Sequence, residues 1–167
     1  MNKKTREITY GAMIAAAYVA LCYLQNALVP NSASFAIQFR VAEALCVLAL
    51  FTPAAIGGLS VGCFLFNISY AGALPLDAVV GTAATFLAAG GMVLTRNLKV
   101  KGYPLLAMLL PAVMNALLVG WELAVYIGGG FWLNAFYVAV GELAVLLTLG
   151  TALYYALKSK RLSRLFD

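Results

Sequence analysis

Apolar runs fill almost the whole of this chain, and only short polar stretches separate them. A helix needs about 20 apolar residues to cross the hydrocarbon core of a bilayer, and the runs are close to that length. A soluble domain could not bury so much apolar surface, because 64% of the residues are hydrophobic and only 10% are charged. The sequence therefore predicts an all-α membrane protein. Its six transmembrane helices span residues 8–28, 38–52, 54–70, 76–95, 103–127 and 132–157.

Six spans use nearly the full length, so residues 1–167 are expected to form one helical bundle without a second domain. The second span stops at Pro53, and at about 1.5 Å per residue it reaches only about 22 Å, which is short for a bilayer. The first span follows three basic residues, so a signal peptide is an alternative for it. The small residues at 31–34 are compatible with that alternative, but the run is longer than a typical signal-peptide core.

The basic residues predict the orientation of the helices. With six spans, both termini and the loops after the second and fourth spans share one side of the membrane. All but one of the Lys and Arg residues fall on that side: Lys3, Lys4, Arg6, Arg96, Lys99, Lys101, Lys158, Lys160, Arg161 and Arg164. Because cytoplasmic loops are rich in Lys and Arg, we expect both termini in the cytoplasm. The net charge of +5 is thus a topology signal, and no nucleic-acid partner is expected.

The polar residues inside the spans concentrate in the outer halves of the helices. Glu122 is expected about 8 Å from the outer end of the fifth span, and Glu142 about 15 Å into the sixth. Such residues are costly in a membrane and normally face a cavity or one another. The candidate substrate-binding residues are Arg40, Glu43, Asn67, Asp77, Asn115, Glu122 and Glu142.

Arg40 and Glu43 share a helix face at a spacing of three residues. A local ion pair at a helix end would explain these two alone. It would not explain the other acids, three of which have no cation nearby in the sequence. A cavity lined with carboxylates and open to the outside suits a ligand with several N–H donors or a positive charge.

Other function classes fit less well. The chain has no histidine, and therefore lacks the commonest general base and metal ligand. Its cysteines, Cys22, Cys46 and Cys63, lie within apolar runs without metal-ligand spacing, so we expect neither a metal nor a cofactor. A carboxylate dyad of the aspartyl-protease kind needs two intramembrane aspartates, and only Asp77 is available. A channel would need polar residues in the inner halves of the helices as well. In a purely structural subunit the polar residues would be scattered rather than gathered in the outer halves.

Small residues form stripes at helical spacing on two spans. Gly58 and Gly62 are expected to pack within the bundle. The stripe of Ala12, Ala16 and Ala20 gives a smooth surface, for which packing against a partner protein is an equal alternative. A separate group of aromatic residues near the outer end of the last two spans fits either an interfacial belt or ligand stacking. It consists of Trp121, Tyr126, Phe131, Trp132 and Tyr137.

Several stretches resemble the QueT family, the substrate-binding S-components of energy-coupling factor (ECF) transporters. The most specific is residues 38–45, which read QFRVAEAL. The others are residues 11–16 (GAMIAA), residues 58–62 (GLSVG) through Asn67, and Asp77 with residues 81–85 (GTAAT). The resemblance covers the chain well to about Asn97. Beyond that point it rests on hydropathy more than on motifs.

The resemblance implies a six-helix importer subunit in a prokaryotic cytoplasmic membrane that captures a queuosine precursor. The substrate would be a 7-deazaguanine, such as 7-aminomethyl-7-deazaguanine or queuine. The implied partners are a membrane coupling subunit, on which Ala12, Ala16 and Ala20 would dock, and two cytoplasmic ATPases. The chain has no phosphate-binding loop of its own. This agrees with the expectation that the chain is not an enzyme and that partner subunits hydrolyse ATP. An S-component for a different vitamin or nucleobase-like nutrient is the alternative.

The polar residues suit such a ligand. A guanine-like edge presents an N–H and an amino group side by side, which one carboxylate can accept together. We expect Glu43 or Glu142 to hold this edge, and Asp77 or Glu122 to meet the cationic amine. The ring carbonyl would accept from Arg40 or Asn67.

Overall fold

The computed structural model describes residues 2–30 and 39–159. Regular structure in these ranges is helical, apart from one isolated bridge between Val100 and Tyr103. The elements are α1 (Lys3–Leu28), the 3₁₀ helix η1 (Val41–Leu50), α2 (Ala54–Ser69), α3 (Asp77–Thr95), α4 (Leu105–Tyr126), α5 (Phe131–Val145), the π-helical turn η2 (Leu146–Gly150) and α6 (Thr151–Lys158). The predicted all-α class is confirmed for this part of the chain.

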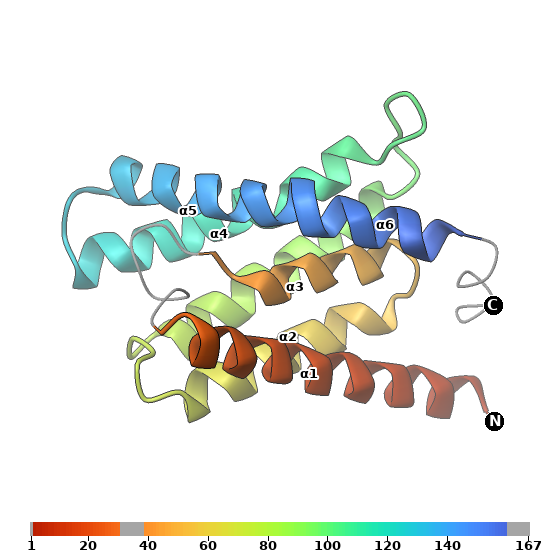
Figure 1. The fold of residues 1–167 in the computed structure, drawn as a ribbon, viewed down its shortest axis with the longest axis horizontal. Helices are drawn as coiled ribbons and strands as arrows, with labels where there is room; N and C mark the ends of the chain where they lie inside the picture. The colour runs from red at the N-terminus through yellow and green to blue at the C-terminus, as the bar shows by residue number, and fades with distance from the viewer. Residues whose placement is uncertain (1, 31–38, 160–167) are drawn as a thin grey trace.

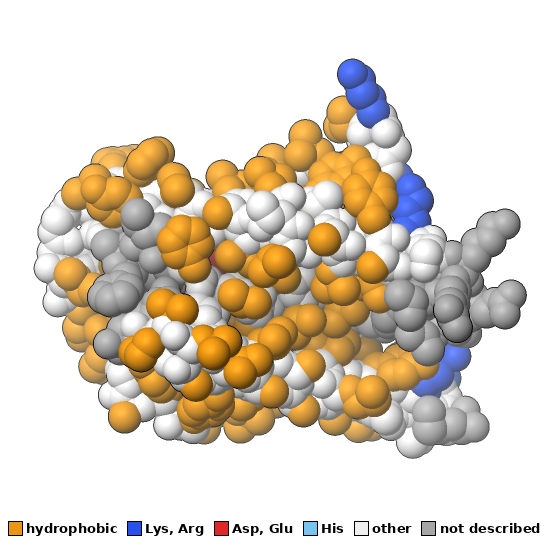
Figure 2. Space-filling view, viewed as in Figure 1, with side chains coloured by type: hydrophobic (Ala, Val, Ile, Leu, Met, Phe, Trp, Pro, Cys, Tyr) orange, Lys and Arg blue, Asp and Glu red, His pale blue; other side chains and the backbone are white. Residues whose placement is uncertain are grey.

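Four helical stretches are long and apolar enough to cross a membrane: α1, α3, α4 and the continuous stretch Phe131–Lys158. The helices η1 and α2 are equally apolar but shorter. Hydrophobic side chains cover the flank seen in Figure 2, and Lys and Arg side chains lie at one end. Large apolar residues are exposed on the bundle, for example Leu94, Phe136 and Trp132. A soluble protein would not expose so much apolar surface.

The expected spans match helices at nearly the same bounds. The expected sixth span corresponds to α5, η2 and α6 together, which run on without a break. The expected start of the second span at Gln38 and the basic tail from Lys160 lie outside the described residues. The first turn of α1 and the last turn of α6 lie at the same end of the bundle (Figure 1).

The short helix η1 lies at the centre of the bundle. Along the chain, α1 packs on α2, α2 on α3, α3 on α4 and α4 on α5, and η1 contacts all of the other helices (Figure 1). Its side chains explain this position, because small or apolar residues fill most of its surface and Ala42, Cys46, Val47 and Ala49 are fully buried. A 3₁₀ helix rises about 2.0 Å per residue, so the ten residues of η1 span about 20 Å. A short apolar helix thus lies where the sequence predicted a short second span.

Glycines bring α1 and α2 into direct backbone contact. A Cβ atom on Gly58 would lie 2.6 Å from the carbonyl oxygen of Gly11, and one on Gly62 would lie 2.8 Å from Cβ of Tyr18. Only glycine fits at such a distance. The expectation that these two glycines pack within the bundle is confirmed. Their contact fixes α1 against α2 and thereby sets the position of Tyr18.

Candidate functional site

The 3₁₀ geometry of η1 stacks its polar residues on one face. In such a helix residues three apart eclipse each other, so Cys46 follows Glu43 in one row, and Arg40 directly precedes the helix. Arg40 does not pair with Glu43 in the described structure. Its ion-pair partner is Asp77, at 3.9 Å between Nη2 and Oδ1, and both side chains are buried. A local ion pair between Arg40 and Glu43 is therefore not what holds these charges.

Glu43 is fully buried, and both of its oxygens accept hydrogen bonds from protein donors. The Tyr18 hydroxyl donates to Oε1 at 2.6 Å, and the Cys46 thiol donates to Oε2 at 3.1 Å. The Tyr18 bond joins α1 to η1 across the core. The buried position of Glu43 is thus compensated within the protein.

Asn67 and Asp77 join α2 to the start of α3. The Asn67 amide donates to the Asp77 carbonyl oxygen at 2.8 Å, and the Leu74 backbone N–H donates to Asp77 Oδ2 at 2.6 Å. A Cβ atom on Gly81 would lie 2.9 Å from Asn67 Nδ2 and 3.7 Å from Arg40 Nη1. Gly81 therefore leaves the space in which these two side chains approach α3.

The polar residues of α4 and α5 are buried but incompletely bonded. Asn115 donates to Glu142 Oε1 at 2.9 Å. Asn115 Oδ1, Glu142 Oε2 and both carboxylate oxygens of Glu122 have no hydrogen-bond partner among the described residues. Glu122 faces Asp77, and two carboxylates cannot donate to each other unless one is protonated. A buried polar atom without a partner costs about 1–3 kcal/mol.

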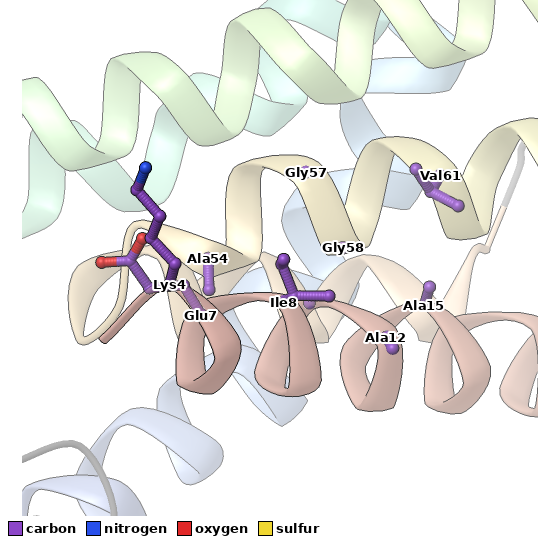
Figure 3. Close-up of a pocket in the computed structure, with 10 residues that line it drawn as sticks. Lys4, Glu7, Ile8, Ala12, Ala15, Ala54, Gly57, Gly58 and Val61 are labelled. Carbon is purple, nitrogen blue, oxygen red and sulfur yellow. The ribbon is translucent and has the colours of Figure 1, made fainter. Parts of the chain in front are cut away.

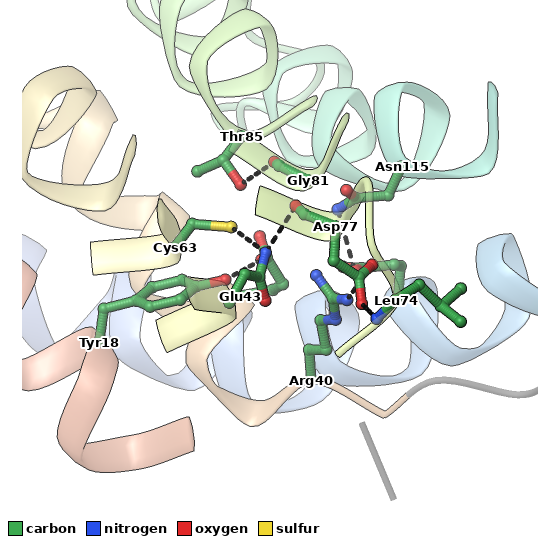
Figure 4. Close-up of polar contacts among 11 residues, drawn as sticks. Tyr18, Arg40, Glu43, Cys63, Leu74, Asp77, Gly81, Thr85 and Asn115 are labelled. Atoms are coloured by element: carbon green, nitrogen blue, oxygen red, sulfur yellow. Dashed lines mark hydrogen bonds and ion pairs between the residues drawn. The ribbon is translucent and has the colours of Figure 1, made fainter. Parts of the chain in front are cut away.

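All seven candidate residues of the site lie in one region. Arg40 is within electrostatic reach of Asp77, Glu122 and Glu142, and Glu142 is within reach of Glu43. Figure 4 shows the side chains of Arg40, Glu43, Asp77 and Asn115 pointing toward a common volume. The region combines four carboxyl groups with one guanidinium, so its formal charge favours a cationic or donor-rich ligand. No group of three His, Cys, Asp or Glu residues in the described chain could hold a metal ion.

Two important polar residues of α1 were not among the sequence candidates. Tyr18 bonds Glu43, and Gln25 Oε1 accepts from the Val41 N–H at 2.7 Å while its amide donates to the Phe39 carbonyl. Both lie on the buried face of α1. They are seven residues, or two helical turns, apart. This spacing places them on one face of the helix and could have identified them from the sequence.

The alanine stripe lies on the outside of the bundle. Ala12, Ala16 and Ala20 are exposed, whereas Ala15 is buried against α2. An apolar groove of about 540 Å³ runs between α1 and α2 at the end where Lys4 lies, and Ala12 lines it together with Ile8 (Figure 3). A docking role for this stripe stays a prediction.

The aromatic residues at the ends of α4 and α5 lie at the periphery. Trp132 is 80% exposed and Trp121 49% exposed. Phe131 packs edge-on against Trp132. This exposure favours an interfacial belt over ligand stacking for the two tryptophans.

Comparison with known families connects this geometry to transport. Neither a curated protein nor a solved structure matches the chain. The family model described as QueT transporter matches residues 8–159, which include every candidate residue of the polar site. Together with the apolar helices, this match makes the chain a multi-pass membrane transport protein, and it belongs to the QueT transporter family.

Proposed function

We propose that this chain is the substrate-binding S-component of an ECF importer and takes up a queuosine precursor of the 7-deazaguanine class. The observation that carries the proposal is the set of buried, unbonded acceptors on α4 and α5. No protein donor among the described residues reaches these atoms. A ligand that brings donors to them would recover the lost hydrogen bonds.

The free atoms favour particular roles in binding. Glu122 has both oxygens free, which suits the paired N–H and amino donors of a guanine-like edge. Glu142 has one free oxygen and receives the Asn115 amide, which suits a single cationic amine. Glu43 is less suited to hold the edge, because Tyr18 and Cys46 occupy both of its oxygens. This assignment differs from the one expected from the sequence alone.

Arg40 would donate to the ring carbonyl of the ligand. Its Nε atom is buried without a hydrogen-bond partner, and its ion pair with Asp77 is long at 3.9 Å. A ring carbonyl is an acceptor that the guanidinium can meet without giving up Asp77. Acceptors and one donor around a common volume match a purine-like ring better than an anionic vitamin.

The proposed orientation puts the polar site toward the outside. Six spans with both termini in the cytoplasm would leave the basic end of the bundle inside the cell and the polar site in the outer half. The coupling subunit would dock on Ala12, Ala16 and Ala20 beside the apolar groove, in a prokaryotic cytoplasmic membrane. Two cytoplasmic ATPases would supply energy, since this chain has no nucleotide-binding loop.

A titration tests the substrate. The chain, purified in a neutral detergent, is titrated by calorimetry with 7-aminomethyl-7-deazaguanine, queuine, guanine and riboflavin. We expect tight binding of a 7-deazaguanine and much weaker binding of guanine. Glu7→Gln, which removes an exposed acid from the other end of α1, is the control and should bind normally. A folded sample that binds riboflavin or no purine-like compound would overturn the assignment and favour a different S-component substrate.

A further inference from the structure

A recess of about 290 Å³ opens at the far end of η1 from Arg40. At this end η1 stops at Leu50, and α6, which packs on η1, continues to Lys158. Four parts of the chain enclose it: the end of η1, the connection between α3 and α4, the start of α4, and α6. The lining residues are Leu50, Phe51, Arg96, Asn97, Lys99, Pro104, Tyr154 and Lys158. We refer to it as the basic recess.

Three cations line the basic recess, and none of them has an ion-pair partner among residues 2–30 and 39–159. Arg96 and Lys99 come from the connection between α3 and α4, and Lys158 comes from the last turn of α6. No carboxylate among the described residues pairs with any of them. Orientation in the membrane requires positive charge on this side, but it does not require segments so distant in sequence to place their charges around one cavity.

The walls of the recess are held in place by specific contacts. The Tyr103 hydroxyl shares a hydrogen bond of 2.6 Å with Thr151 Oγ1, which ties the α3–α4 connection to α6. The ring of Tyr154 packs against Tyr103 at 5.6 Å and against Phe51 at 5.9 Å between centroids. Lys158 Nζ lies 5.7 Å from the centre of the Tyr154 ring. The segments that carry the cations are therefore held together by hydrogen bonds and ring packing.

Apolar side chains lie beside the cations of the recess. Leu50, Phe51 and Pro104 supply carbon surface inside it. On the connection that carries Arg96 and Lys99, Leu98 is 57% exposed and Val100 is 58% exposed. Apolar side chains that alternate with cations fit the boundary between hydrocarbon and headgroups. A site that served only a soluble anion would have no use for them.

We propose that the basic recess binds the phosphate-bearing headgroup of an anionic phospholipid. The three cations would surround the phosphate, and the lipid chains would follow the apolar flank of the bundle. Basic pockets between transmembrane helices on the cytoplasmic side take such headgroups. The site lies at the opposite end of η1 from the polar site and does not depend on the proposed substrate.

Native mass spectrometry on the full chain tests the proposal. The chain in neutral detergent is titrated with phosphatidylglycerol and, separately, with phosphatidylcholine of the same acyl chains. We expect phosphatidylglycerol to bind to the chain and phosphatidylcholine to bind much more weakly. The triple variant Arg96→Gln, Lys99→Gln, Lys158→Gln should weaken phosphatidylglycerol binding on the order of 100-fold, since each cation near an anionic headgroup contributes about fivefold.

The matched control removes three other cations of the same end, by Lys3→Gln, Lys4→Gln and Lys101→Gln, none of which lines the recess. It should keep phosphatidylglycerol affinity within about threefold. An equal loss in both triple variants would overturn the proposal, because general surface charge would then explain the binding. Glycerol 3-phosphate that competes at the same concentration as the lipid would overturn the lipid assignment in favour of a soluble anion. An unchanged thermal melting curve for both variants shows that the fold is retained.

Discussion

Two groups of polar residues lie side by side in the bundle and differ in what their atoms do. The bonded group, Glu43, Asn67 and Asp77 on η1, α2 and α3, donates to or accepts from other helices and loops. The open group, Asn115, Glu122 and Glu142 on α4 and α5, retains free acceptors although it is equally buried. Under the proposed function, the difference separates residues that hold the bundle together from residues that would bind the ligand. Burial alone does not make that distinction.

The largest expected effect comes from removing the acids of the open group. The double variant Glu122→Gln, Glu142→Gln should lose about 1000-fold in affinity for a 7-deazaguanine, because each charged hydrogen bond is worth about 1.5–3 kcal/mol. The melting temperature without ligand should stay the same or rise, since both oxygens of Glu122 and one oxygen of Glu142 have no protein donor to lose. Calorimetry and tryptophan-fluorescence melting measure the two effects. A fall in melting temperature would place these acids in the bonded group instead.

The opposite pattern is expected for the bonded group. Tyr18→Phe removes the donor to Glu43 Oε1 and leaves a buried acceptor unpaired, which should lower the free energy of unfolding by about 1–3 kcal/mol. Ligand affinity should change by less than about threefold. The same two measurements apply, in the same detergent. If affinity fell strongly while stability held, the division into two groups would be wrong.

Gly81 lies where the bonded group meets α3 and tests the boundary between the groups. Gly81→Ala would bring a methyl group 2.9 Å from Asn67 Nδ2, and we expect a loss of about 1–2 kcal/mol in stability. Gly90→Ala on the same helix is the matched control, since nothing lies within 4 Å of its Cβ position. It should be stabilising by about 0.5–1 kcal/mol, as for other helix interiors. Equal melting curves for the two variants would refute the close packing at Gly81.

The smallest effect is expected at Cys46. Its thiol is a weak donor to Glu43 Oε2, so Cys46→Ala should cost about 1 kcal/mol, from the lost bond and the smaller side chain. Cys46→Ser keeps a donor and should be closer to the wild type. Thermal melting compares the pair. A serine variant less stable than the alanine variant would show that Glu43 does not need this donor.

Much of the fold followed from hydropathy. The apolar runs were long, and Pro53 and the triple glycine at residues 128–130 marked two of the breaks, so helices were expected within a few residues of where they lie. The 3₁₀ form of η1 was not foreseen, because hydropathy does not distinguish helix types. Its central position follows from tertiary packing by all the other helices. That packing is a long-range property that no local pattern contains.

The site was foreseen as a set of residues but not as a network. Intramembrane acids are conspicuous because they are costly, so all of them were identified. Which oxygen of Glu43 meets Tyr18, and which oxygens of Glu122 meet nothing, depends on how helices far apart in sequence approach one another. The pairing of Arg40 with Asp77 rather than Glu43 is of the same kind. Sequence spacing gives neighbours on one helix only.

The most direct measurement is a calorimetric titration of Glu43→Gln, Glu122→Gln and Glu142→Gln, one at a time, with the 7-deazaguanine that binds the wild type best. All three changes replace a buried carboxyl group of the same region by an amide. The account predicts losses of about 10- to 100-fold for Glu122→Gln and Glu142→Gln, and less than about threefold for Glu43→Gln. A large loss for Glu43→Gln together with normal binding by the other two would contradict it.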